Sequence, residues 1–359
     1  MNILNLIRPE ILNLEPYQAK NRSAYKILLD GNESPYPPSS KIKDLIKTRL
    51  DSLDLNRYPD PEAKILKEDL AKYYGVETSN IILGNGSDEL ILYLILAFCN
   101  NSDSIICPSP TFAMYKILAQ TAGTQYIEIP LDQDFDLECN LLIDTIEEKK
   151  SKLLFLASPN NPTGNTFSSS MILDLLNQKN CIVVLDEAYG YFCKKSFLKK
   201  LDKYDNLIIL KTFSKIGLAG LRFGVLICNE HLIKEISKVR LPFNVNSFSQ
   251  MVTSIILENT LELEKDINII IKERDFLFSN LNSIKGVTPY PTEANFILFK
   301  SNIDVDIVYN ELVNKGILVR NFKHPRLKNS LRVTVGLPEE NKKFIEGLTD
   351  IFNEIKISA

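Results

Sequence analysis

Short apolar runs alternate with amphipathic segments between about residues 41 and 246 of the chain. Apolar residues recur at helical spacing in four segments, which are Lys41–Leu50, Glu62–Tyr74, Leu90–Phe98 and Ser168–Asn177. Six further runs are short and apolar like buried strands, namely Ile81–Leu83, Ser104–Cys107, Lys152–Ala157, Cys181–Leu185, Leu207–Leu210 and Phe223–Cys228. This alternation predicts βα units, and therefore an α/β fold whose mostly parallel sheet is sandwiched by helices.

Polar clusters follow directly after four of the predicted strands. They read GNGSDE after Ile81–Leu83, SPNNPTG after Lys152–Ala157, DEAY after Cys181–Leu185 and KTFSK after Leu207–Leu210. In open α/β sheets, ligands bind outside the carboxyl ends of the strands. We therefore expect the four clusters to converge on one site.

The chain is expected to have three parts. Residues 1–40 form an N-terminal arm that ends in a proline-rich joint, Asn32–Ser40, and residues 41–246 form the large domain. Residues 247–359 predict a smaller α/β domain, with the boundary near Ser247. Its expected elements are a long charged helix over Gln250–Asn280, strands Asn295–Phe299, Ile317–Arg320 and Ser330–Val335, a helix over Asp304–Lys315, and a final helix from Pro338. The strands and the helix over Asp304–Lys315 read as a βαβ-like set.

Composition narrows the classes of protein that remain. The formal net charge of -3, from 42 Lys+Arg against 45 Asp+Glu, argues against a nucleic-acid partner. The longest apolar run, Ile91–Cys99, is about half the length that a bilayer demands, which argues against a membrane protein. The six cysteines include no CxxC pair and the N-terminus lacks the apolar region of a secretion signal, so we expect a cytoplasmic protein. His231 and His324, the two histidines, show no metal-ligand spacing, and no metal is expected.

The residues of the four clusters are suited to hold and use a substituted pyridine. A lysine near an apolar sheet edge and close to Arg222 has its ammonium form disfavoured, so Lys215 could become a nucleophile that forms Schiff bases. Asp186 could pair with a protonated ring nitrogen. Tyr189 and Asn161 could both reach a phenolate oxygen on the same ring.

An anion site is expected beside that ring. Backbone N–H groups at Gly84 and Gly86 can bind a phosphate where Ser87 and Asp88 open a helix. Further donors for the same dianion are Thr212, Ser214 and Arg222. A pyridine that carries a hydroxyl, an aldehyde and a phosphate requires this set of groups, and pyridoxal 5'-phosphate is such a molecule.

The chain resembles the histidinol-phosphate aminotransferase family of fold-type I pyridoxal-phosphate enzymes. The matching motifs, in chain order, are EPYQ, LDGNESPYP, RYPDP, GNGSDE, PSPTFAMY, SPNNPTG, DEAY, KTFSKIGLAGLRFG and LRVTVG. The resemblance implies that Lys215 is the Schiff-base lysine and proton shuttle, that Asp186 pairs with the pyridine nitrogen, and that Phe112 stacks on the cofactor. Tyr189 and Asn161 match the pair that contacts the phenolic oxygen. The implied phosphate cradle consists of Ser87, Asp88, Thr212, Ser214 and Arg222.

The resemblance also implies a partner subunit and two substrates. Tyr58, in RYPDP, matches a residue that reaches the cofactor phosphate of the neighbouring subunit, which implies a homodimer with shared active sites. The substrate-binding residues implied by the family are Tyr17, Asn32, Arg320 and Arg332. We expect Arg320 and Arg332 to lie on neighbouring strand ends, facing the same edge.

The expected reaction moves an amino group between L-glutamate/2-oxoglutarate and a phosphorylated ketone. Imidazole-acetol phosphate, which gives L-histidinol phosphate, is the ketone that the resemblance favours. Two alternatives stay open, a smaller ketone such as dihydroxyacetone phosphate and a decarboxylase of phosphorylated amino acids with the same fold. A nicotinamide dehydrogenase is disfavoured because GNGSDE lacks the third glycine of G-x-G-x-x-G, and no P-loop motif is present.

Overall fold

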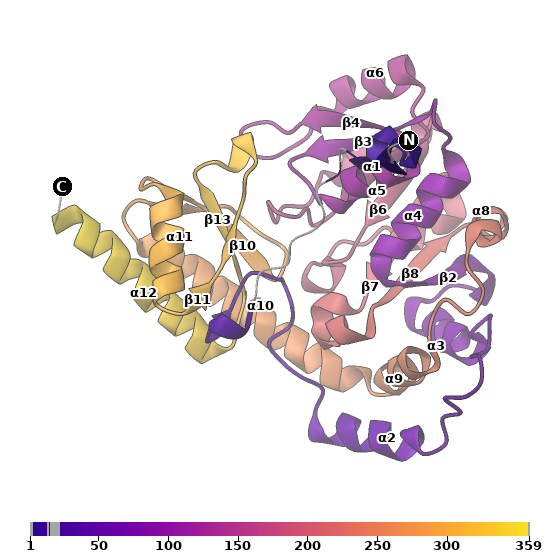
Figure 1. The fold of residues 1–359 in the computed structure, drawn as a ribbon, viewed down its shortest axis with the longest axis horizontal. Coiled ribbons are helices and arrows are strands. Elements are labelled where there is room, and N and C mark those ends of the chain that lie inside the picture. The colour runs from indigo at the N-terminus through magenta and orange to yellow at the C-terminus, as the bar shows by residue number, and fades with distance from the viewer. Residues whose placement is uncertain (1–2, 13, 15–21, 358–359) are drawn as a thin grey trace.

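The computed structural model describes residues 3–12, 14 and 22–357 (Figure 1). Within them, a large sheet of seven strands has the order β2-β8-β7-β6-β5-β3-β4. The strands are β2 (Ile81–Asn85), β3 (Ser104–Ser109), β4 (Gln125–Pro130), β5 (Leu153–Ala157), β6 (Ile182–Asp186), β7 (Leu207–Thr212) and β8 (Phe223–Cys228). All neighbours are parallel except at β8, which is antiparallel to both β2 and β7. The predicted mostly parallel sheet is confirmed.

The direction of β8 decides where the other strands end. Because β8 is antiparallel to both of its neighbours, β2 runs parallel to β7 and thus to β5 and β6. The four strands that precede the polar clusters therefore end at the same edge of the sheet, as predicted.

Both faces of the large sheet are buried, since successive strand residues alternate between two apolar cores. In β5, Leu153 and Phe155 face a core shared with three helices, α4 (Gly86–Phe98), α5 (Met114–Ala122) and α8 (Glu230–Ile236). Leu154 and Leu156 face the opposite core, which includes α6 (Cys139–Lys149) and α7 (Ser169–Gln178). Strand β4 and helix α6 are elements that the sequence analysis missed.

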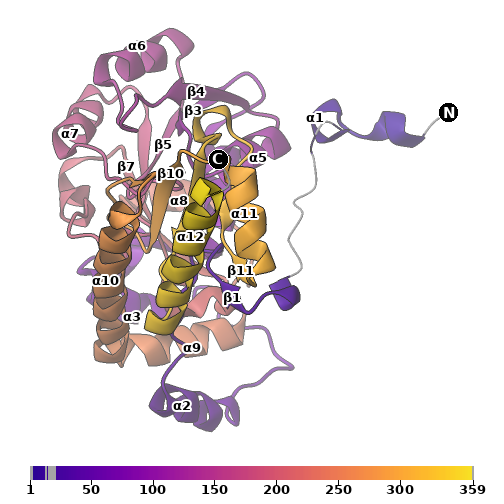
Figure 2. The same cartoon turned by 90° about the vertical axis from the view of Figure 1, so that its left-hand side faces the viewer.

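A small antiparallel sheet, in the order β12-β13-β10-β9, lies beside the large one (Figure 1). Its strands are β9 (Val287–Pro289), β10 (Phe296–Ser301), β12 (Arg320–Asn321) and β13 (Ser330–Thr334). Both β10 and β12 are antiparallel to β13, so they run parallel to each other and form a split βαβ unit with α11 (Val305–Asn314). Helix α12 (Pro338–Ile357) lies between α11 and α10 (Thr260–Ser283), as Figure 2 shows.

Two predicted elements differ from the structure. The strand expected over Ile317–Arg320 is split, because β11 (Ile317–Leu318) pairs with β1 (Ile27–Leu28) and only β12 joins the small sheet. The helix expected over Gln250–Asn280 is two helices, α9 (Ser247–Leu257) and α10, with Glu258 and Asn259 between them. Helix α9 packs against α2 (Ser40–Leu50) and α3 (Lys64–Tyr74), whereas α10 reaches the small sheet. The domain boundary near Ser247 stays a prediction.

A buried ion pair joins the ends of β6 and β7. Lys211 Nζ lies 2.5 Å from Glu187 Oε2, and both side chains are less than one-tenth exposed. Ser196 Oγ and the Phe197 N–H donate to the two Glu187 oxygens, at 2.8 and 2.9 Å. The Glu187 carboxylate is thus fully surrounded by donors, directly after Asp186 in the chain.

Within the described ranges, no helix is both long and apolar enough to cross a membrane. The same part of the chain holds no group of three or more His, Cys, Asp or Glu side chains suited to a metal ion.

Candidate active site

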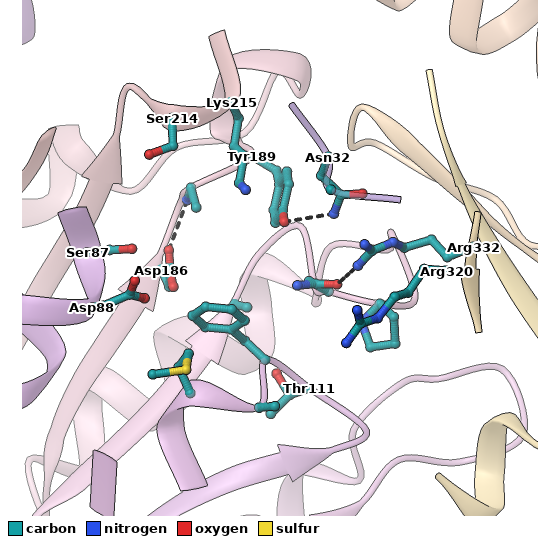
Figure 3. Close-up of a pocket in the computed structure, with 18 of the residues that line it drawn as sticks. Asn32, Ser87, Asp88, Thr111, Asp186, Tyr189, Ser214, Lys215, Arg320 and Arg332 are labelled. Carbon is teal, nitrogen blue, oxygen red and sulfur yellow. Dashed lines mark hydrogen bonds between the residues drawn. The ribbon is translucent and has the colours of Figure 1, made fainter. Parts of the chain in front are cut away.

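A cavity of about 390 Å³ lies between the carboxyl edge of the large sheet and the small sheet (Figure 3). The predicted site residues that line it are Asn32, Ser87, Asp88, Phe112, Asn161, Asp186, Tyr189, Thr212, Ser214, Lys215, Arg222, Arg320 and Arg332. The four polar clusters therefore converge, as the positions of their strands predicted. Tyr58 is not part of this lining, and Tyr17 lies outside the described residues.

Asp186, the last residue of β6, places a buried carboxylate in the cavity wall. Its side chain is buried, and it accepts hydrogen bonds from the Ala188 N–H (3.0 Å, to Oδ1) and the Tyr115 hydroxyl (2.7 Å, to Oδ2). Burial raises the pKa of Asp186 to about 6, while the two hydrogen bonds and the positive charge of Lys215 act in the opposite direction. A carboxylate in these surroundings favours a cationic partner, such as a protonated ring nitrogen.

Lys215 follows β7 in a short helical segment, Ser214–Leu218, and its amine points into the cavity beside Tyr189 (Figure 3). The Lys215 Nζ atom lies 5.7 Å from the centroid of the Tyr189 ring. The Tyr189 hydroxyl accepts a hydrogen bond from Asn32 Nδ2 at 2.9 Å. Asn32 is buried and its Oδ1 accepts a hydrogen bond from the Thr334 hydroxyl at 3.1 Å, so this amide has a fixed orientation. The amine, the phenol and the amide together form one polar wall of the cavity.

The opposite end of the cavity has groups suited to a phosphate. Gly86 opens α4 with a φ of 76°, and Ser87 and Asp88 follow it at the helix N-terminus. Arg222 Nη2 lies 3.0 Å from Asp88 Oδ2, and a Cβ on Gly86 would come within 2.8 Å of the same nitrogen. Gly224 permits a similarly close approach, because a Cβ there would lie 2.5 Å from the Gly86 main chain. The absence of these Cβ atoms lets the guanidinium, the hydroxyls and the main-chain N–H groups share one cradle.

Two arginines enter the cavity from the small sheet (Figure 3). Arg320 and Arg332 are direct partners in the antiparallel pair β12–β13, which confirms that they lie on neighbouring strands. Arg332 is buried, and its guanidinium donates to Asn161 Oδ1 and to the main-chain oxygen of Asp30. Arg320 makes no salt bridge with any carboxylate in the described part of the chain. Two adjacent guanidinium groups can bind carboxylate or phosphate oxygens of a substrate.

The loop between the two arginine strands contacts the large sheet. His324 Nδ1 accepts a hydrogen bond from the Arg326 N–H, and its Nε2 lies 3.2 Å from Ser109 Oγ at the end of β3. Arg326 Nη1 donates to the main-chain oxygen of Leu131 at 2.8 Å. Phe322 and His324 also line the cavity, so this loop closes it on the substrate side.

Sequence reasoning assigned no role to Thr111, Phe322 and His324, which line the cavity. It also assigned none to Tyr115, which lies behind the cavity wall and contacts Asp186. Tyr115 had a usable signal, since a tyrosine on the buried face of a helix needs a hydrogen-bond partner. Phe322 and His324 had none, because their place in the cavity depends on how the loop folds against the large sheet.

Tyr58 lies outside the cavity and is one of the most exposed aromatic residues, at 81%. Its ring stacks on Phe243 with centroids 4.6 Å apart. The role of Tyr58 toward a partner subunit stays a prediction.

Comparison with known proteins agrees with this site. The family described as Aminotransferase class I and II matches residues 24–348. Histidinol-phosphate aminotransferase of Aquifex aeolicus is 40% identical over 355 residues, which cover 98% of this chain and 100% of the relative. That of Clostridium novyi is 42% identical over 344 residues, covering 96% of each.

Among solved structures, histidinol-phosphate aminotransferase from Sinorhizobium meliloti, in complex with pyridoxal-5'-phosphate, has a TM-score of 0.89 and 20% identity over 98% of both chains. At that identity the likeness shows the fold. The family match and the two relatives extend over nearly the whole chain, including every strand end that lines the cavity. The chain therefore belongs to the class I and II aminotransferases, which are pyridoxal-phosphate-dependent enzymes of fold-type I, and within them to the histidinol-phosphate aminotransferase family.

Proposed function

We propose that this aminotransferase moves the amino group of L-glutamate to imidazole-acetol phosphate, which yields 2-oxoglutarate and L-histidinol phosphate. The observation that carries the proposal is the cross-strand pair Arg320 and Arg332, which faces the cofactor end of the cavity. One pocket must accept a carboxylate in one half-reaction and a phosphate in the other, and paired guanidinium groups bind both anions. The curated relatives at about 40% identity carry the corresponding name.

The cavity residues divide the work as follows. Pyridoxal phosphate, when bound, supplies an electron-accepting ring for the negative charge that develops at the substrate Cα. The Asp186 carboxylate would hold a proton on the ring nitrogen, and Phe112 would pack against the ring. Lys215 is the amine that would hold the cofactor covalently, and its Nζ would accept the proton from the substrate Cα.

The remaining polar residues orient the cofactor and the substrate. Tyr189 and Asn161 would hold the phenolic oxygen, while Asn32 and Arg332 would hold the carboxylate of the amino donor. The phosphate of the cofactor would be bound by the hydroxyls of Ser87, Thr212 and Ser214, the main-chain N–H of Asp88 and the guanidinium of Arg222. Within this set, Asp88 orients Arg222 through the contact of 3.0 Å.

We further propose a cytoplasmic homodimer in which Tyr58 completes the active site of the partner subunit. The support is the exposed apolar surface on the two segments that meet at Tyr58, with Leu55, Leu241 and Phe243 beside it. Large exposed apolar residues that cluster in this way mark protein interfaces. The six cysteines are all unpaired, which suits a reducing compartment.

The test is a set of half-reactions of the pyridoxamine form of the enzyme with different ketones. We expect imidazole-acetol phosphate to react faster than dihydroxyacetone phosphate, and unphosphorylated imidazole acetol to react slowest. Equal rates with phosphorylated and unphosphorylated ketones would overturn the role of the phosphate. Faster reaction with dihydroxyacetone phosphate, or release of CO₂ from a phosphorylated amino acid, would overturn the proposed substrate and reaction.

A further inference from the structure

Tyr115 is a buried tyrosine whose hydroxyl reaches the carboxylate at the cofactor site. It lies in the first turn of α5, and its side chain has no exposed surface. Its hydroxyl donates to Asp186 Oδ2 at 2.7 Å. A phenol in an apolar core requires a partner, and here that partner is a residue that faces the cavity.

The position of the Tyr115 ring is fixed by two aromatic contacts. The ring stacks on Phe155 of β5, with centroids 5.0 Å apart and planes at 24°. Its other contact is edge-on with Phe112, at 5.5 Å and 88°. Phe112 is the ring expected to pack on the cofactor, so Tyr115 contacts two groups that hold it. A change at Tyr115 therefore acts on both the face and the nitrogen end of the cofactor ring.

We propose that Tyr115 is a positioning residue, which fixes the plane of the Asp186 carboxylate. By stabilising the ionised carboxylate, it keeps the proton that lies between Asp186 and the cofactor ring nitrogen on the nitrogen. Each carboxylate oxygen has one fixed donor, Tyr115 for Oδ2 and the Ala188 N–H for Oδ1. With both oxygens held, the carboxylate presents one orientation to the cavity. The inference rests on the proposed role of Asp186.

The electrostatic surroundings explain why a neutral donor is suited to this place. Burial and the nearby negative charge of Asp88 favour the protonated carboxyl, whereas Tyr115, the Ala188 N–H and the positive charge of Lys215 favour the carboxylate. Burial also holds the pKa of Tyr115 well above its usual value, so at neutral pH the phenol keeps its proton and donates it in the hydrogen bond to Asp186. A cationic donor at this position would compete with the ring nitrogen for Asp186, and the phenol does not.

The test replaces Tyr115 by phenylalanine, which keeps the ring and both aromatic contacts but removes the hydroxyl. The matched control is Tyr74→Phe, because Tyr74 is a partly buried tyrosine whose hydroxyl also makes a 2.7 Å hydrogen bond, to Tyr191 away from the cavity. Two measurements apply, the ¹⁵N chemical shift of the ring nitrogen in ¹⁵N-labelled bound pyridoxal phosphate, and the Kd of pyridoxal phosphate for the cofactor-free protein.

We expect Tyr115→Phe to move the ¹⁵N shift toward the value of unprotonated pyridine and to weaken cofactor binding by roughly 10- to 100-fold, as for the loss of a hydrogen bond to a charged group. Tyr74→Phe should leave both unchanged. In the Asp186→Asn background, Tyr115→Phe should change neither measurement further, because its effect passes through that carboxylate.

The outcomes separate this inference from the role of Asp186. If Asp186→Asn shifts the ¹⁵N signal and Tyr115→Phe leaves it as in the parent, the inference about Tyr115 is overturned while Asp186 keeps its role. An additive effect of Tyr115→Phe in the Asp186→Asn background also overturns it, since the tyrosine would then act by another route. If Asp186→Asn itself leaves the signal at the protonated value, the proposed role of Asp186 fails.

Discussion

The burial of Asp186 should make the stability of the cofactor-free protein fall with rising pH, relative to a variant with an amide at that position. The folded-state pKa is about 6, against an ordinary value of 3.8 in the unfolded chain. The folded protein therefore binds this proton more tightly than the unfolded chain, so the contribution of Asp186 to stability is largest below pH 4, is lost as the pH rises through 6, and is constant above about pH 7. A difference of about two pKa units corresponds to about 3 kcal/mol.

The assay is urea denaturation of the cofactor-free parent and of Asp186→Asn at a series of pH values from 4 to 8. The free energy of unfolding of the variant, minus that of the parent, should rise by about 2 kcal/mol between pH 4 and 6, by a few tenths more as the pH passes the folded-state pKa, and level off above about pH 7. One of the two donors, Tyr115 or Ala188, loses its acceptor in the variant, which adds an offset of about 1–3 kcal/mol that is independent of pH. The slope with pH is therefore the diagnostic quantity. Parallel curves for the two proteins would refute the reasoning.

Three further predictions concern the reaction. Arg332→Ala should slow both half-reactions. Arg320→Ala should weaken binding of the phosphorylated ketone by about 2–4 kcal/mol more than binding of glutamate, as measured from the concentration dependence of the two half-reactions in stopped-flow absorbance. Equal effects of Arg320→Ala on both substrates would contradict the assignment. Lys215→Ala should abolish turnover and the visible absorbance of covalently bound cofactor while circular dichroism stays unchanged, and a coloured, active variant would remove the central assignment. Mixed and reassembled Tyr58→Ala and Lys215→Ala subunits should regain part of the activity, whereas sedimentation of the parent as a monomer at micromolar concentration would exclude the shared site.

Local patterns predicted the parts of the fold that depend on short stretches of chain. The strand ends before Asp186 and Lys215 were visible because apolar runs stop abruptly at polar residues. The break between α9 and α10 was not, since Glu258 and Asn259 include neither glycine nor proline and the apolar pattern continues across them. The position of β8 between β2 and β7 depends on pairing between distant segments, which no local pattern records.

In the candidate site, too, some features follow from local sequence patterns and others depend on contacts between distant segments. The residues that follow the strands could be predicted together because parallel strands end at one edge. The contacts made by Tyr115 with Asp186, and by Asn32 with Tyr189, join residues 71 and 157 positions apart, and each depends on how whole layers pack. The pairing of Arg320 with Arg332 was predictable, since a short loop joins their strands.

The ion pair between Lys211 and Glu187 limits which sequences this fold can reach by single changes. Removing either partner leaves a buried charge without its counterion, which costs about 3–5 kcal/mol. Replacing both by apolar residues of similar volume is often neutral or even stabilising. Here an apolar pair would also leave the Ser196 hydroxyl and the Phe197 N–H without their acceptor, so a stable apolar version lies more than two substitutions away, with an unstable protein at each intermediate step. Random mutagenesis at low mutation rates, followed by selection for folded protein, should recover the ion pair almost unchanged.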